Sequence, residues 1–444
     1  MLDQSFTPRN LRNIYDKENR KGIYLDHQFP SIVEELSMQL KRERAIKKRL
    51  QKRKETFIHE TYYELRGRIK NNIKELKDER NIHIDEHLNT ISERISSKKF
   101  NLNIERHNTP HHDKQAYKIS NNQESFFAEK QLQENIKKTY KVKQSDRDAI
   151  ISQLIAILGD PFPKHIIRTD ISSFYESIDR TKLQNKIDSK PQLSLASRKL
   201  IKKVLMDYKS LTGSTKGIPR GIGISAYLAE LYMKETDEKI KSLPNVIYYT
   251  RYVDDIIVVF SPSPDGTTPN HISEVKTIIE DVGLILNSDK TNAIDFRNGN
   301  NFSFDYLGYK FKYSSGLKVG ISNNKIEKYR QRITSSFDVY QRGHKGRNAR
   351  KMLINRIRFL TGNTKLTNNK GGAFVGIYSS NKWANDHSSL KGLDAFLRHK
   401  TNQLDCPNLK ERIEKLSFEE GFINKNFRHF SASQLGRLTK AWRL

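Results

Sequence analysis

The sequence predicts an α+β protein in which a sheet delivers a set of acidic residues. Residues 248–260, Tyr-Tyr-Thr-Arg-Tyr-Val-Asp-Asp-Ile-Ile-Val-Val-Phe, are typical of two short strands that meet at a tight turn carrying Asp254 and Asp255. Around this hairpin the patterning follows the order strand, helix, helix, hairpin, helix, strands. Long helical segments precede and follow this region, which is the arrangement expected of an α+β fold.

The composition indicates a partner with many negative charges. The 444 residues include 80 Lys or Arg and 51 Asp or Glu, which gives a formal charge of +29. Solubility alone rarely needs such a surplus, so nucleic acid is the first candidate partner. The chain is also longer than one core usually supports, and we expect two or three lobes.

Cysteine usage and apolar runs bear on the compartment. The single cysteine, Cys406, excludes an internal disulfide and a cysteine-based zinc site, and it fits a reducing compartment. The first residues show no apolar signal region, and no run approaches transmembrane length. A cytoplasmic location is therefore expected, without membrane contact.

The N-terminal part predicts long, basic helices. Residues 29–97 are almost free of Pro and Gly and rich in Lys, Arg, Glu, Leu and Ile. Residues 41–54 contain nine Lys or Arg and one acidic residue, Glu43. A charge run is usually a solvated helix face, but so many positive charges would repel one another, and we expect phosphate contacts. The predicted contacts are Lys41, Arg42, Arg44, Lys47 and Lys48.

A polar stretch at residues 101–114 follows these helices. It contains His107, His111, His112 and Asp113. Nothing in their spacing fixes a ligand geometry, so we expect a loop rather than a metal site.

The centre of the chain alternates between helical and extended patterns. Residues 126–158 are helical or mixed, with Lys143 and Arg147 just before an apolar stretch. A strand is expected at 165–171, where it delivers Asp170. Further helices are expected at 182–208, 226–240, 272–282 and over most of 322–444, strand-like pieces near 284 and at 302–313, and loops at 217–223, which is rich in Gly, and 261–270.

The acidic residues suggest a metal site. If both flanks of the turn are buried strands, Asp254 and Asp255 place two like charges at the edge of a core, which is costly unless a cation neutralises them. Oxygen ligands favour Mg²⁺ or Mn²⁺ over zinc. Asp170 lies on a strand that could pair in the same sheet, and carboxylates of this kind can hold two metals about 4 Å apart for phosphoryl transfer. These residues alone predict a metal-dependent enzyme acting on nucleic acid, either a polymerase or a nuclease.

Five segments resemble the successive palm motifs of reverse transcriptases, in the order of that family and at plausible spacing. They are Arg168-Thr-Asp-Ile-Ser-Ser-Phe-Tyr175, Gly217-Ile-Pro-Arg-Gly-Ile-Gly-Ile-Ser225, Tyr252-Val-Asp-Asp255, Leu286-Asn-Ser-Asp-Lys-Thr291 and Tyr306-Leu-Gly308. Residues 140–147 resemble the fingers segment that precedes these motifs. The Tyr-Xaa-Asp-Asp tetrad alone would be a weak signal, whereas five segments in register are specific.

The resemblance implies a two-metal polymerase site. It makes Asp170 and Asp254 the principal ligands of two Mg²⁺ ions, or of Mn²⁺, with Asp255 and Ile171 beside them. Lys290 matches a lysine that assists the departure of pyrophosphate, although a plain charge at a helix end would read the same.

The resemblance also implies nucleotide and primer contacts. Tyr175 matches an aromatic steric gate that excludes a ribose 2′-hydroxyl, and a core tyrosine is the alternative interpretation. The other implied nucleotide contacts are Lys143, Arg147 and Gly221, and the implied template and primer contacts are Arg220, Tyr306, Leu307 and Gly308. Ordinary helix-surface charge is the alternative for Lys143, and a strand turn that needs Gly is the alternative for residues 306–308.

The sequence departs from the family in the glycine-rich bend. Arg220 stands where Gln is usual, Ala226 replaces Pro, and Glu230 stands where Asn is common. Because this bend packs beside the template in the family, Arg220 is expected to alter template grip or base preference.

The implied architecture is a right-handed polymerase. The expected segments are a helical basic N-terminal extension at 1–100, fingers at 101–167, a palm with an antiparallel sheet at 168–315, and a helical thumb or C-terminal region at 316–444. In the last segment, Arg350 and Arg356 are expected to bind RNA.

The chain is most similar to bacterial defence-associated reverse transcriptases of the abortive-infection group. Residues 358–363 and 374–378 resemble a component of type-3 systems, which pair two reverse transcriptases with a noncoding RNA. The resemblance implies a noncoding RNA template, a DNA product, dNTP substrates, and a second reverse transcriptase or a homo-oligomer as partner. An RNA polymerase, a template-independent polymerase, a retron-like enzyme and a catalytically silent RNA-binding scaffold remain alternatives.

Overall fold

The computed structural model describes residues 2–108, 114–189, 191–263, 270–296, 301–366 and 372–442. The chain forms two compact units, which are described separately. The first consists of Met1–Gln144, Ser173–Thr236 and Val282–Leu284, and the second of Ser145–Ser172, Asp237–Asp281 and Ile285–Leu444. The mixture of helices and antiparallel strands confirms the predicted α+β class. Within the described part of the chain, no helix is long and apolar enough to span a membrane.

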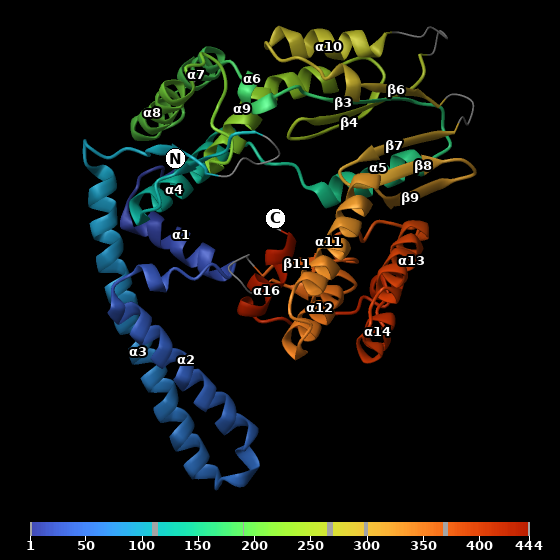
Figure 1. The fold of residues 1–444 in the computed structure, drawn as a ribbon. Helices are drawn as coiled ribbons and strands as arrows, with labels where there is room; N and C mark the ends of the chain where they lie inside the picture. Colours follow the sequence, from blue (N-terminus) through green and yellow to red (C-terminus); the bar gives the residue numbers. More distant parts are fainter. Residues whose placement is uncertain are drawn as a thin grey trace. The chain divides into compact units, whose positions relative to one another are not determined.

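The first unit is largely helical (Figure 1). Its helices are α1 (Pro8–Arg20), α2 (Ser31–Lys52), α3 (His59–Ser96), α4 (Gln123–Tyr140), α6 (Phe174–Ser177), α7 (Arg180–Ser189), α8 (Leu195–Thr212) and the start of α9 (Gly223–Lys241). Short 3₁₀ turns lie at Asp26–Gln28 and Lys54–Thr56. The predicted long N-terminal helices are thus confirmed as α2 and α3.

Helices α2 and α3 form an antiparallel hairpin whose two ends differ in packing (Figure 1). Near its C-terminal end, α3 buries Ile84, Leu88, Ile91 and Ile95. Towards its N-terminal end, only Tyr62 is buried. The distal half of the hairpin therefore exposes its charged side chains instead of packing them against a core.

The segment predicted as a loop at residues 101–114 contains a strand. In it, β1 (Ile104–Arg106) pairs antiparallel with β2 (Tyr117–Ile119). Strands of three residues carry too little periodicity to be recognised in a polar stretch. His111, His112 and Asp113 lie outside the described residues, as do residues 264–269 of the predicted loop at 261–270.

The second unit contains a four-stranded antiparallel sheet in the order β4-β5-β3-β6. Its strands are β3 (His165–Asp170), β4 (Val246–Tyr252), β5 (Asp255–Phe260) and β6 (Asn292–Asp295). Strand β5 is central, and every residue from Ile256 to Phe260 is fully buried, as the apolar run predicts. Helix α5 (Arg147–Gly159) buries Ile150, Ile151, Leu154 and Leu158 in the same core as the sheet residues Ile257 and Val259.

A second sheet and a group of helices complete this unit. The sheet contains β7 (Phe302–Tyr306), β8 (Tyr309–Tyr313) and β9 (Leu317–Ile321). The helices are α10 (His271–Asp281), α11 (Asn323–Arg342), α12 (Arg347–Leu360), α13 (Ser388–Asn402), α14 (Pro407–Glu414), α15 (Phe418–Ile423) and α16 (Ala432–Thr439). Short 3₁₀ turns lie at Ser288–Lys290 and Lys440–Trp442, and β10 (Asn363–Lys365) pairs with β11 (Phe374–Gly376).

Candidate active site

Three carboxylates gather at one end of the four-stranded sheet in the second unit. Antiparallel pairing places Asp170, the last residue of β3, opposite Asp255, the first residue of β5. Asp254 precedes Asp255 in the two-residue turn between β4 and β5, and its carbonyl accepts a hydrogen bond of 3.0 Å from the N–H of Ile171. The predicted pairing of the two acidic segments in one sheet is therefore confirmed.

The turn that carries Asp254 is strained. Val253 has a φ of 61°, a left-handed conformation that is unfavourable for a β-branched residue. Such a conformation persists only when the surroundings hold it. Arg251 supplies one such contact, because its Nη1 donates a 2.8 Å hydrogen bond to the carbonyl of Val253.

A buried hydrogen-bond network fixes the position of Arg251. Its guanidinium binds both carboxylate oxygens of Asp237 at 2.9 and 2.8 Å, and its side chain is only 3% exposed. The hydroxyl of Tyr249 donates to Asp237 at 2.6 Å, and that of Ser145 donates to the carbonyl of Arg251 at 2.6 Å. This support was missed from the sequence, because nothing in the spacing of Asp237 and Arg251 indicates a bidentate pair.

The site disfavours the charge of Asp255. Burial, together with the neighbouring Asp170 and Asp254, raises the pKa of Asp255 to about 6, although the charges of Arg168 and Lys290 act in the opposite direction. Arg168 lies 3.6 Å from Asp255. Lys290 Nζ lies 3.0 Å from Asp170 Oδ2. Two positively charged side chains, those of Arg168 and Lys290, therefore already lie beside the acidic residues at this end of the sheet.

The donor set suits a hard divalent cation. Carboxylate oxygens are the ligands that Mg²⁺ and Mn²⁺ prefer, and a cation would relieve the repulsion that raises the Asp255 pKa. Among the described residues, however, no group of three or more His, Cys, Asp or Glu side chains is already gathered closely enough to hold a metal ion. A metal site held by Asp170, Asp254 and Asp255, with Ile171 adjacent, therefore stays a prediction.

A tight hairpin turn lies next to the acidic residues. Leu307 and Gly308 join β7 to β8 with φ values of 45° and 80°, which is the left-handed pair of a type I′ turn. The hydroxyl of Tyr306 donates to the carbonyl of Asp255 at 3.4 Å. Burial, with the nearby charge of Asp255, raises the pKa of Tyr306. The Tyr306 hydroxyl therefore stays protonated and can donate its hydrogen bond to the Asp255 carbonyl.

Arg147 is bound to this turn. Its Nε and Nη2 donate to the carbonyl of Leu307 at 3.0 and 2.7 Å, and its guanidinium lies 4.9 Å from the ring centre of Tyr309. Its contact with an incoming nucleotide stays a prediction. In this structure the guanidinium supports the turn.

A basic pocket adjoins the turn within the second unit. Its volume is about 540 Å³, and Asp255 and Asp305 are its acidic lining residues. The basic lining residues are Arg147, Arg168, Lys325, Lys328 and Arg332. Burial, with the nearby charge of Arg147, lowers the pKa of Lys325 to about 8. A pocket of this charge beside an acidic edge suits a phosphate-bearing strand whose end reaches a metal.

The other predicted nucleotide and template residues lie in the first unit. Arg220 forms two hydrogen bonds with Glu176, of 3.0 and 3.2 Å, and lies 5.0 Å from the ring centre of Tyr175. Gly221 has a φ of 97°, and a Cβ there would lie 2.7 Å from the carbonyl oxygen of Tyr117. The glycine in this bend is therefore required by backbone packing as well as by conformation. Lys143 is exposed in the same unit.

The predicted RNA-binding residues differ in exposure. Lys41, Arg42, Arg44 and Lys48 are exposed on α2, and Lys47 is partly exposed. Arg350 is exposed on α12. Arg356 is only 7% exposed, and its Nε donates to the carbonyl of Leu438 at 3.4 Å, so packing within the unit accounts for this residue.

The sequence comparison identifies the class of protein that carries this site. Residues 43–311 match the family described as reverse transcriptase (RNA-dependent DNA polymerase). This match spans more than half of the chain. The chain belongs to the reverse transcriptase family, which confirms the predicted enzyme class and the predicted resemblance at the level of that family, and membership of the defence-associated group stays a prediction.

No curated protein matches the chain. Among solved structures, it is similar to apo telomerase from Candida tropicalis truncated from its C-terminal domain, with 15% identity, a TM-score of 0.36, and coverage of 52% of this chain and 56% of that one. It is also similar to telomerase from Candida albicans in complex with a TWJ fragment of telomeric RNA, with 12% identity, a TM-score of 0.31, and coverage of 70% and 56%. The chain thus spans little more than half the length of these telomerases.

Proposed function

We propose that this protein copies RNA into DNA from dNTPs, using two divalent metal ions, Mg²⁺ or Mn²⁺. The observation that carries the proposal is the convergence of Asp170, Asp254 and Asp255 at one end of a sheet, in a chain of the reverse transcriptase family. Asp170, Asp254 and Asp255 would hold such metals, which would supply activation of an attacking hydroxyl and stabilisation of a leaving phosphate oxygen.

The remaining residues of the second unit have complementary roles in this proposal. The turn at Leu307 and Gly308 positions the primer end, and Arg147 holds the turn by its hydrogen bonds to the Leu307 carbonyl. The basic pocket beside it binds primer phosphates. Lys290, which lies 3.0 Å from Asp170, neutralises charge on the departing pyrophosphate.

Removing one carboxylate tests the site. Asp254→Asn should lower the incorporation of labelled dNTPs by roughly 10²–10³-fold, the scale seen when one preorganised charge-stabilising group is lost. Asp295→Asn is a matched control, since Asp295 pairs with His165 at the far end of β3 and should leave incorporation unchanged. Full activity of Asp254→Asn would refute the site.

The substrate class rests on Tyr175. If this side chain excludes a ribose 2′-hydroxyl, Tyr175→Ala should admit NTPs while dNTP incorporation persists. Comparing dNTP and NTP incorporation in both proteins distinguishes a DNA polymerase from an RNA polymerase of the same fold. Wild-type protein that prefers NTPs would contradict the assignment.

The template is proposed to be a bound noncoding RNA, and the biological role to be bacterial antiphage defence. This part rests on the resemblance to defence-associated reverse transcriptases and on the charge of +29. A second reverse transcriptase or a further copy of the chain is the proposed partner, in the cytoplasm.

Sequencing the nucleic acid that accompanies the purified protein tests this part. A DNA product complementary to one bound RNA is expected after dNTPs are added. A product that survives prior removal of that RNA would favour untemplated synthesis. Absence of product, with RNA still bound, would favour a scaffold.

A further inference from the structure

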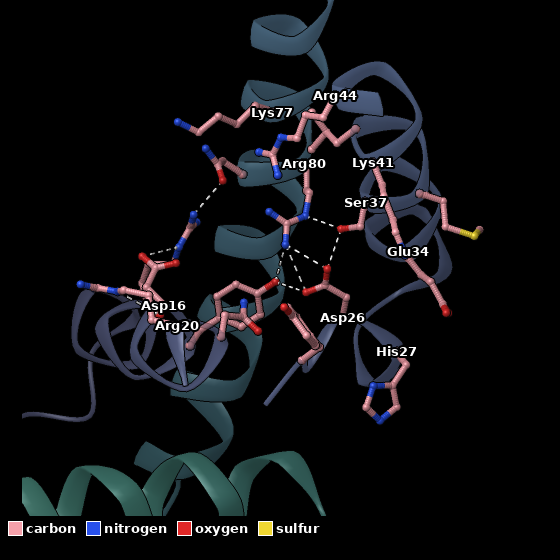
Figure 2. Close-up of a pocket in the computed structure, with 17 residues that line it drawn as sticks. Asp16, Arg20, Asp26, His27, Glu34, Ser37, Lys41, Arg44, Lys77 and Arg80 are labelled. Carbon is pink, nitrogen blue, oxygen red and sulfur yellow. Dashed lines mark hydrogen bonds and ion pairs between the residues drawn. The ribbon is translucent and has the colours of Figure 1, made fainter. Parts of the chain in front are cut away.

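A hollow in the first unit is lined by none of the residues of the candidate active site. Helices α1, α2 and α3 and the short turn at Asp26–Gln28 surround it, and its volume is about 1060 Å³ (Figure 2). We refer to it as the N-terminal pocket. Its size exceeds what one phosphate ion needs and matches the larger ligand sites of proteins.

A hydrogen-bond network builds one wall of the N-terminal pocket (Figure 2). Arg80 of α3 donates to Ser37 Oγ at 2.5 Å and to Asp26 at 3.0 and 3.1 Å. Tyr15 and Ser37 also donate to Asp26. Burial raises the pKa of Asp26, but these hydrogen bonds and Arg80 outweigh burial and lower it. Asp26 is therefore ionised, and Arg80 balances its negative charge.

Besides Arg20, whose Nε donates to the carbonyl of Asp16 at 3.2 Å, three cations that line the N-terminal pocket have no acidic partner within the described part of the chain. Lys41 and Arg44 come from α2 and Lys77 from α3, and all three are exposed. Within the described part of the chain, none of them forms an ion pair. Arg12, in contrast, binds Asp85 at 2.7 Å and Asp16 at 3.4 Å.

The pocket also offers apolar surface. Tyr24 is 63% exposed and Met38 is 50% exposed, although large apolar side chains are normally covered. An exposed aromatic ring beside unpaired cations is the combination on which single-stranded nucleic acid is held, with phosphates on the cations and a base on the ring.

We propose that the N-terminal pocket binds a single-stranded segment of RNA, with phosphates at Lys41, Arg44 and Lys77 and a base stacked on Tyr24. This inference rests on the proposed RNA-copying function and adds a second RNA contact, in the first unit.

The surrounding charge favours a polymer over a free nucleotide. Between Lys41 and Arg80 the α2–α3 hairpin carries 15 Lys or Arg and 7 Asp or Glu. The unpaired cations of the pocket therefore continue along the hairpin, where further phosphates of the same strand can follow. A free nucleotide would leave the cations along the rest of the hairpin without a phosphate partner.

Photocrosslinking tests the location. A 20-nucleotide single-stranded RNA containing 4-thiouridine is crosslinked to the full chain. Mass spectrometry should then locate the crosslink in the peptide that contains Tyr24. The crosslink should fall at least tenfold in Lys41→Gln/Arg44→Gln/Lys77→Gln. It should persist in Arg49→Gln/Arg53→Gln/Arg66→Gln, which removes equal charge from the same hairpin outside the pocket lining.

Salt dependence gives a second readout. Each phosphate contact with a single strand adds about 0.7 to the slope of log affinity against log salt. The pocket triple variant should therefore lower the slope by about 2 for RNA bound through this site, and the control triple should lower it by less than the pocket triple does. Equal losses in both would overturn the pocket and leave only general attraction.

Glu34 permits a gain-of-binding test that does not depend on damaging the site. This exposed carboxylate lines the pocket and would repel phosphate. Glu34→Gln should raise the crosslink yield twofold or more, and Tyr24→Ala should lower it about tenfold. An unchanged yield in Glu34→Gln would count against the proposal, as would complete competition by millimolar ATP.

The outcome can be separated from that of the proposed function. If wild-type protein polymerises but shows no crosslink at Tyr24, the pocket inference alone fails. A crosslink in a protein that incorporates no dNTP would refute the proposed function and leave the pocket standing.

Discussion

Lys325 is a partly buried cation in the basic pocket of the second unit. Because its pKa is lowered to about 8, its side chain loses its proton between pH 7 and pH 9, whereas a lysine with the ordinary value of 10.5 stays charged. Affinity for a primer–template should therefore fall severalfold over this range, and Lys325→Arg should remove most of the fall. Fluorescence anisotropy with a labelled duplex measures both, and a flat wild-type profile would contradict the role.

The same shift has a defined effect on stability. The unfolded chain binds the Lys325 proton more tightly than the folded chain, so protonation favours unfolding. The cost is fully present below pH 8 and disappears as the pH rises towards 10.5. Lys325→Met should remove this pH dependence from urea unfolding curves.

Asp237 and Arg251 support the acidic turn without touching its carboxylates. Removing one partner of a buried ion pair costs about 3–5 kcal/mol, so Asp237→Ala should destabilise the protein by that amount in urea unfolding. Where the variant is still folded, kcat should fall while KM for primer–template stays unchanged, because Arg251 also holds the Val253 carbonyl.

Glu238→Ala is the matched control for this prediction. Glu238 is the exposed neighbour of Asp237 and pairs with Lys241 at the surface, so its removal should change stability by less than about 1 kcal/mol. If Asp237→Ala lowers stability but leaves kcat intact, the pair is structural only.

Single residues could be predicted where chemistry requires a given type. Asp170, Asp254 and Asp255 followed from acidic residues at strand ends and from the motifs around them. Asp237 and Arg251 did not, because their pairing depends on how α9 packs against β4, which local sequence does not encode. Arg356 was predicted from its charge, yet it is buried against Leu438.

At the scale of elements, substitutions of two glycines test whether glycine is required in the bend at residues 217–223 and in helix α3. Gly221→Ala would force a side chain into a left-handed backbone and to within 2.7 Å of the Tyr117 carbonyl, and it should cost more than the roughly 1–2 kcal/mol of the conformation alone. Gly67→Ala in α3 meets nothing within 4 Å and should stabilise the hairpin by about 0.5–1 kcal/mol. Thermal unfolding of both variants checks the opposite signs, and equal signs would contradict this account.

Elements with strong periodicity were predictable, and short ones were not. The hairpin of β4 and β5 and the long helices α2 and α3 follow from apolar alternation and from the lack of Pro and Gly. The three-residue strands β1, β10 and β11 depend on partners across the chain and have no comparable local signal.

For the whole molecule, the repulsion among the acidic residues predicts stabilisation by metal. Mg²⁺ or Mn²⁺ at about 100 times its dissociation constant would stabilise the folded state by about 2.7 kcal/mol, which corresponds to a Tm rise of a few degrees. The rise should be lost in Asp170→Asn/Asp254→Asn and retained in Asp295→Asn. Equal shifts in all three proteins would show that the metal binds elsewhere.

For the whole molecule, the family was predictable because five segments resemble the motifs of reverse transcriptases in the order of that family. The α+β class was predictable from the order of strand-like and helical patterns along the chain. The division of the chain was harder to predict. Each compact unit combines stretches that are distant in sequence, so the four predicted segments do not coincide with the two units, and their assignment to fingers, palm and thumb stays a prediction.

Primer extension on a defined RNA template tests the central claim most directly. With Mg²⁺ and dNTPs, wild-type protein should yield DNA whose sequence is complementary to the template, and Asp254→Asn should yield at least about 100-fold less. Product from Asp254→Asn at the wild-type rate, or wild-type product that ignores the template sequence, would contradict the assignment of this acidic edge to RNA-templated DNA synthesis.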